Sequence, residues 1–300
     1  MYHYVRDLPK TPFPRLKGMM PDAFAMQIAN LQRRYEVATL EAALDFLAGR
    51  YRPARDLVLL TFDDGLKEHF TEVTPLLAEH GIQGLFFLPT AGVGDHRVLA
   101  VHKSHFLMAL LDFAEYRRAF LEVLDAMSVR IDPAVDAEKA RNTYRWDTQD
   151  VASFKYLVNF GLPSETRLRA LDALFASHLG DEAQFARGLY VSWDEARQMQ
   201  SVGMLIGGHS HEHLALATLS TESWKADLQN CMGLLRQNLA PQPAWPFSYP
   251  YGKPSSFNAD IIGELQKLGV CCSFGTEVGA NSIGQDLFNL CRFDPKDLAA

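Results

Sequence analysis

Two groups of polar residues, each at the end of an apolar run, have the composition of a metal site. Asp63 and Asp64 follow the run LVLLT (57–61) and precede a glycine. His209 and His213 follow MLIGG (204–208) and are four residues apart. Residues four apart face the same way on a helical turn, so both imidazoles can bind one ion. With a carboxylate they suit zinc or a similar divalent ion, and three protein ligands leave a position for water.

Each group alone also has an ordinary structural explanation. One carboxylate of an isolated Asp-Asp-Gly turn can cap the following helix, and HSHEH can be a solvent-facing turn. Two adjacent carboxylates repel each other unless a cation compensates. Together the motifs favour a site, because the C-terminal ends of parallel strands carry the active sites of α/β barrels.

Alternating strands and helices must position these residues. Strands are predicted at 35–38, 57–61, 84–89, 188–192, 204–208, 244–250 and 270–274. Helices are predicted at 21–34, 40–47, 193–200, 221–238 and 257–268, with another between Gly65 and Gly81. Ser192 and Glu195 have the spacing of a capping box at the start of the helix from 193. Single helices between strands imply parallel pairing.

The fold class predicted from this order is α/β, a distorted (β/α) barrel of about seven parallel strands with an all-helical insertion. Residues 1–97 and 188–300 are expected to form the N-terminal and C-terminal parts of this barrel. The insertion, 98–187, contains only helical patterns, at 104–126, 148–160 and 165–179. It departs from a strand end, so we expect a substrate-recognition lid, with a dimer interface as the alternative.

Composition excludes some classes of function. The 300 residues have a net charge of -7 and no basic run, which argues against nucleic acid. No apolar stretch approaches the roughly 18 residues of a membrane span. The first residues lack the apolar region of a signal peptide, and the four cysteines have no CxxC spacing, which favours free thiols. These features predict a cytoplasmic protein, with export left open.

Three motifs in order resemble those of a known family. TFDDG (61–65), HSHEH (209–213) read as H-S-x-x-H, and FSYPYG (247–252) are similar to motifs of the polysaccharide deacetylases. This is the NodB-homology group, carbohydrate esterase family 4. The resemblance covers residues 55–90 and 188–275 and is specific because each motif lies at a predicted strand end.

The resemblance implies a metal-dependent deacetylase and assigns roles to matching residues. Asp63 would be the general base, and the metal ligands would be Asp64, His209 and His213. Zinc is the first choice of ion, with cobalt, nickel or manganese as alternatives. The metal would acidify a water molecule and polarise the acyl carbonyl, and Asp63 would take the proton.

The third motif implies the rest of the catalytic site. The backbone N–H of Tyr251 would help to bind the oxyanion. Pro250 and Gly252 would shape this loop and are counted as substrate-binding residues.

The chain departs from the family pattern in three places. Ser248 stands where the family usually has an arginine that pairs with the base, and Arg292 is a candidate replacement, also counted as substrate-binding. There is no convincing D-x-x-D-W segment. No histidine follows His213, so the general acid of the usual C-terminal motif is missing. Relatives with permuted motifs carry an N-terminal Tyr-His, which Tyr2-His3 resembles. His3 is therefore the candidate acid, with a frayed terminal histidine as the alternative.

One further pair of histidines is three residues apart at the start of the insertion. His105, with His102, could contact a substrate or a second metal ion, although a partly buried polar face is the simpler explanation.

The first functional hypothesis is removal of an acetyl group from a sugar or surface-polysaccharide precursor, with an N-acetyl group preferred to an O-acetyl group. The alternative is a non-catalytic metal- and carbohydrate-binding protein on the same fold, against which the retention of both aspartates argues. A phosphatase phosphorylated on aspartate leaves the histidines unexplained. The oligomeric state is not predicted.

Overall fold

The computed structural model describes residues 1–130 and 136–298. The chain divides into two compact units. The sheet unit comprises residues 1–7, 17–96 and 186–300, and the helical unit comprises residues 8–16 and 97–185. No pattern in the sequence predicts that residues 8–16 group with the helical segment.

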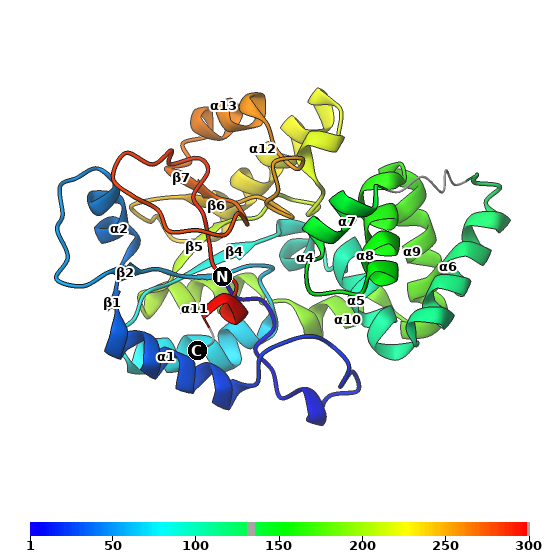
Figure 1. The fold of residues 1–300 in the computed structure, drawn as a ribbon, viewed down its shortest axis with the longest axis horizontal. Helices are drawn as coiled ribbons and strands as arrows, with labels where there is room; N and C mark the ends of the chain where they lie inside the picture. Colours follow the sequence, from blue (N-terminus) through cyan, green and yellow to red (C-terminus); the bar gives the residue numbers. More distant parts are fainter. Residues whose placement is uncertain (131–135, 299–300) are drawn as a thin grey trace. The chain divides into compact units, whose positions relative to one another are not determined.

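The sheet unit is built on a curled sheet of five parallel strands that forms a half-barrel (Figure 1). Its strands, in the order in which they pair, are β3 (Leu60–Phe62), β4 (Gly84–Leu88), β5 (Leu205–Gly208), β6 (Pro246–Ser248) and β7 (Cys272–Phe274). Every residue of these strands is buried, which explains why they appear in the sequence as apolar runs. The α/β fold class and distorted barrel predicted from the sequence are confirmed.

A second sheet of two parallel strands pairs β1 (Glu36–Val37) with β2 (Leu57–Val58). Leu59 separates β2 from β3, so the run predicted as one strand is shared between two sheets. Single parallel bridges extend both edges of the larger sheet, Tyr2 beside Phe62 and Leu290 beside Phe274.

The strand predicted at 188–192 is wrong. Helix α10 (Glu182–Leu189) continues through Gly188, and Tyr190 makes only one antiparallel bridge, with Leu66. A short apolar run such as GLYV does not by itself distinguish a buried strand from the buried end of a helix.

The other helices of the sheet unit follow the predicted order closely. They are α1 (Pro21–Arg34), α2 (Leu40–Leu47), α3 (Thr74–Glu79), α4 (Thr90–Gly94), α11 (Trp193–Ser201), α12 (Thr221–Asn238) and α13 (Ala259–Lys267). Shorter helical segments are the π-helix η2 (His69–Val73) and the 3₁₀-helices η4 (Leu216–Thr218) and η5 (Pro295–Leu298). The capping box of Ser192 and Glu195 at the start of α11 is confirmed.

The sheet unit has an aromatic core beside β3. The ring of Phe62 stacks on Phe86 at 4.7 Å and on Tyr2 at 5.1 Å. Phe24, on the buried face of α1, packs edge-on against Tyr2 at 5.2 Å. These contacts fix the end of β3, from which the Asp63 turn begins.

The helical unit contains η1 (Leu8–Lys10), α5 (Ala100–Leu110), α6 (Phe113–Ala126), α7 (Ala137–Thr143), α8 (Gln149–Tyr156), η3 (Leu157–Gly161) and α9 (Ser164–Leu179). The single helix predicted at 104–126 is two helices, because Asp112 caps α6 in a capping box with Glu115. Tyr116, Phe120 and Phe154 lie in the core of this unit. Whether it acts as a lid stays a prediction.

Among the described residues, no helix is long and apolar enough to cross a membrane.

Candidate metal centre and active site

The first site turn follows β3 directly. Asp63 and Asp64 are both buried, with 2% and 3% of their surface exposed. Successive side chains of an extended strand point to opposite faces. Asp64 instead adopts a left-handed conformation (φ 80°), as does Gly65 (φ 58°). The chain therefore turns at Asp64, and its carboxylate faces the second motif.

The second turn follows β5. His209 and His213 are buried, but the turn that joins them is not helical. Ser210 and His213 have left-handed φ values of 62° and 53°, and the N–H of His213 donates to Ser210 Oγ at 2.9 Å. The helical turn predicted for this pair is wrong. The side chains converge because of the two left-handed residues.

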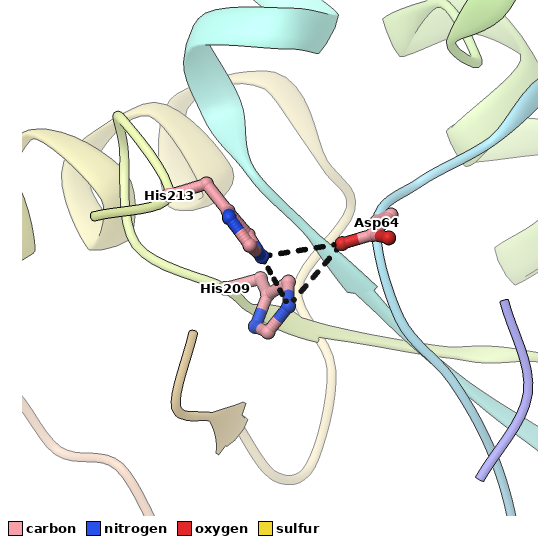
Figure 2. Close-up of side chains that lie close together, drawn as sticks. All are labelled: Asp64, His209 and His213. Atoms are coloured by element: carbon pink, nitrogen blue, oxygen red, sulfur yellow. Dashed lines mark hydrogen bonds and ion pairs between the residues drawn. The ribbon is translucent and has the colours of Figure 1, made fainter. Parts of the chain in front are cut away.

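Three potential ligand atoms meet in a small triangle (Figure 2). The Nε2 atoms of His209 and His213 are 3.2 Å apart, and Asp64 Oδ1 lies 3.5 Å from the first and 3.3 Å from the second. Tetrahedral zinc with bonds of about 2.0–2.2 Å requires ligand atoms roughly 3.3–3.6 Å apart. In the part of the chain that the structure describes, this is the one group of three or more such side chains close enough to hold an ion. The residues present therefore fit a divalent metal.

The hydrogen bonding of His209 supports the same conclusion. Its Nδ1 lies 2.6 Å from the carbonyl oxygen of Ser248. Because a carbonyl can only accept, Nδ1 carries the proton in this contact, and the Nε2 lone pair of the neutral ring points into the triangle. Burial lowers the pKa of His209, but the carboxylates of Asp63 and Asp64 outweigh it and leave the pKa raised.

Asp63 is held by a buried arginine. Arg292 donates from Nη1 to Oδ1 and from Nη2 to Oδ2, both at 2.8 Å, and Ser248 Oγ donates to Oδ2 at 3.1 Å. Burial raises the pKa of Asp63, but Arg292 and then His209 outweigh it, so the pKa is lowered. The pairing proposed for Arg292 is present, and Ser248, at the position of the usual arginine, joins the network. A substrate-binding role for Arg292 stays a prediction.

The third motif forms a loop after β6. Pro250 is buried, and the partly exposed ring of Tyr251 lies 5.5 Å from that of His213. Gly252 is left-handed (φ 59°), and a Cβ there would lie 2.7 Å from Thr276 Cγ2 and 2.8 Å from its backbone nitrogen. Only glycine fits this position, which explains the end of the FSYPYG motif.

The N-terminal segment runs beside the Asp63 turn. The N–H of Asp63 donates to the carbonyl of Tyr2 at 2.9 Å, and the N–H of Tyr2 donates to Thr61 at 2.8 Å. The carbonyl of His3 accepts from Nε2 of His69 at 2.9 Å. His3 is partly exposed, and it is the smallest of the influences that lower the pKa of Asp63. The structure thus brings His3 near the predicted base.

The remaining predicted residue belongs to the helical unit. His105 lies on α5, with its ring 5.9 Å from that of the buried His102. Its assignment as a substrate-binding residue stays a prediction.

One buried residue that contacts the site was not predicted. Asp227, on α12, accepts the backbone N–H groups of His211 and Glu212, each at 2.8 Å. The feature of the sequence that could have indicated Asp227 is its place as a carboxylate on the apolar face of a helix, three residues after Trp224 and four before Cys231.

The half-barrel carries, at the C-terminal ends of its strands, an Asp-His-His group that could hold a metal ion. The family model described as polysaccharide deacetylase matches residues 50–129 and 159–272. The chain belongs to the polysaccharide deacetylase family and is a hydrolase that acts on amide bonds.

Solved structures with a similar fold include two described as a deacetylase and a de-N-acetylase. The Streptococcus pyogenes deacetylase PplD, in complex with acetate, is 15% identical with a TM-score of 0.59, over 98% of this chain and 89% of that one. IcaB from Ammonifex degensii is 18% identical with a TM-score of 0.56, over 99% and 91%. A de-N-acetylase from Aggregatibacter actinomycetemcomitans is 16% identical with a TM-score of 0.55, over 97% and 92%. At these identities the likeness shows the fold alone. No curated protein matches the chain.

Proposed function

We propose that the protein removes an acetyl group from the nitrogen of an amino sugar in a polysaccharide or its precursor, with a divalent ion held by Asp64, His209 and His213. The observation that carries this proposal is the buried triangle of ligand atoms beside the Asp63–Arg292 pair. The acetate bound to one protein of similar fold, and the de-N-acetylase activity of another, support the choice of an N-acetyl group.

The ion supplies two effects when bound: it acidifies a water molecule toward a pKa of about 7 and polarises the acyl carbonyl. Zinc is the preferred ion because two imidazole nitrogens and one carboxylate oxygen suit it. Cobalt, nickel and manganese are alternatives.

Asp63 acts as the proton acceptor. Its lowered pKa keeps the carboxylate ionised at neutral pH, and Arg292 and Ser248 fix its orientation. A carboxylate with a lowered pKa is a weak base. Asp63 would therefore take the proton most readily from a water molecule that an ion in the neighbouring ligand triangle would acidify.

Two other groups complete the site. The N–H of Tyr251 would donate to the oxyanion that forms as water attacks, an interaction stronger in the transition state than in the substrate. The imidazole of His3 would donate a proton to the departing amine. The backbone hydrogen bonds of Tyr2, which hold this segment beside Asp63, support that assignment.

The proposal is tested by measuring acetate release from a short oligomer of N-acetylated amino sugars. Chelator-treated protein should be inactive, and added zinc should restore activity. Asp63→Asn should remain inactive with zinc bound. Binding of the oligomer without acetate release, by zinc-loaded wild type, would support the non-catalytic alternative instead. Release only from an O-acetylated sugar would correct the bond that is cleaved.

A further inference from the structure

The turn between the two metal-binding histidines has its amide groups fixed by side chains. The N–H of His213 donates to Ser210 Oγ at 2.9 Å. The N–H groups of His211 and Glu212 donate to Oδ1 and Oδ2 of Asp227, both at 2.8 Å. One carboxylate from another element thus holds the two residues nearest the middle of this turn.

The position of Asp227 on its helix is unusual for a carboxylate. It lies on the buried face of α12, with 5% of its surface exposed, among Trp224, Leu228 and Cys231. This face packs against β5 and α4. Burying a charge in an apolar stripe is costly unless the charge is hydrogen-bonded, and an apolar side chain would suit helix packing better. The two hydrogen bonds to backbone N–H groups explain why a carboxylate stands here, which the packing of the helix does not.

The turn needs such support because its backbone is strained. Ser210 and His213, on either side of the two amides, are both left-handed. Non-glycine residues keep this conformation only where their surroundings over-determine it. The carbonyl side of the turn is held by α4, through the N–H groups of Thr90 to Ser210 at 3.2 Å and of Ala91 to His211 at 3.0 Å. Asp227 holds the amide side.

We propose that Asp227 is a positioning residue for the metal centre. By fixing the turn, it sets the spacing between Nε2 of His209 and Nε2 of His213, which is 3.2 Å. Without its acceptors, the N–H groups of His211 and Glu212 lose their partners, the turn relaxes and the imidazoles no longer converge. This inference rests on one part of the proposed function, namely that Asp64, His209 and His213 bind an ion.

The test is the zinc dissociation constant of the whole protein, measured by competition with a chromophoric chelator. Asp227→Asn keeps the size of the side chain but turns an amide NH2 toward one of the two N–H groups. Loss of a group that orients metal ligands typically weakens binding about 10–100-fold, and this is the expected change. Glu222→Gln removes the same charge from an exposed position on the same helix and should leave the constant unchanged. Circular dichroism of the metal-free proteins checks that each variant is folded.

The outcomes separate this inference from the function on which it rests. Wild-type protein that binds no zinc would overturn the metal site itself. If the wild type binds zinc and folded Asp227→Asn has a dissociation constant within threefold of the wild-type value, only the role of Asp227 is overturned. If Asp227→Asn does not fold, Asp227→Leu, which suits the apolar stripe and offers no acceptor, is measured in the same way. Weakened binding by this variant supports the proposal, and unchanged binding overturns it.

Discussion

Replacing Arg292 with methionine should destabilise the sheet unit strongly. Arg292 and Asp63 have only 4% and 3% of their side-chain surface exposed. The guanidinium makes two bonds to Asp63, one to Ser248 Oγ at 2.9 Å and one to the carbonyl of Gly275 at 2.7 Å. Arg292→Met removes all of them and leaves a buried carboxylate without its counter-charge.

The expected loss follows from this burial. Removing one partner of a buried ion pair typically costs about 3–5 kcal/mol, a large share of the roughly 5–15 kcal/mol that stabilises a domain. The matched control is Arg50→Met. Arg50 pairs with Asp45 at 2.6 Å, but its side chain is 66% exposed. An exposed pair contributes about 0–1 kcal/mol, so the control should lose little.

The free energy of unfolding is measured by urea denaturation followed by tryptophan fluorescence. Three of the tryptophans, Trp193, Trp224 and Trp245, lie in the sheet unit and report its transition. The double variant Asp63→Asn, Arg292→Met should recover part of the loss, because no charge is left buried and unpaired. The reasoning is refuted if Arg292→Met loses no more than Arg50→Met, or if the double variant is no more stable than Arg292→Met.

Three further predictions test the site and its supports. Asp63→Asn should lower acetate release by about 10²–10⁴-fold while zinc content stays at the wild-type level; loss of the metal would make Asp63 a ligand. Gly252→Ala should lose at least about 1 kcal/mol of stability, from its left-handed φ of 59° and its contact with Thr276, and should lower activity; wild-type values for both would contradict the steric argument. Burial lowers the pKa of His69 in the folded chain. Below about pH 6.5, His69 therefore binds a proton in the unfolded chain but stays neutral in the folded one. The stability from His69 is therefore complete above that pH and falls on acidification, by up to about 1.4 kcal/mol between pH 7.5 and 5.5. Unfolding curves at the two pH values should differ less for His69→Phe than for the wild type; an equal difference would show that His69 does not contribute.

The three residues of the proposed metal site could be picked out in the sequence because the chemistry of metal binding restricts residue types. Asp64, His209 and His213 come from two runs far apart in the sequence, but parallel strands bring their C-terminal ends to one edge. Arg292 could be proposed as the partner of Asp63 only because Ser248 stands where the family usually has an arginine.

Other features depend on information that residue types do not carry. Asp227 binds backbone amides, which are the same for every sequence except proline, so only its place on an apolar helix face marks it. The turn from His209 to His213 is left-handed at two residues other than glycine, which residue propensity argues against. The break at Asp112 could have been predicted, because Asp112 and Glu115 have the spacing of a capping box inside the helix expected at 104–126.

The left-handed residues of the three motif turns have a consequence for how this protein can change. Of the six non-glycine residues with positive φ among those described, four are Asp64, Ser210, His213 and Tyr251. Each conformation costs about 1–2 kcal/mol relative to glycine. Selection for thermostability would favour glycine at all four, yet two of them supply proposed metal ligands and cannot change without losing the ion. Ser210 Oγ also accepts the N–H of His213 and so helps to hold this ligand in place. Tyr251 is thus the position where a more heat-resistant descendant could relax its backbone and still keep its ligand set.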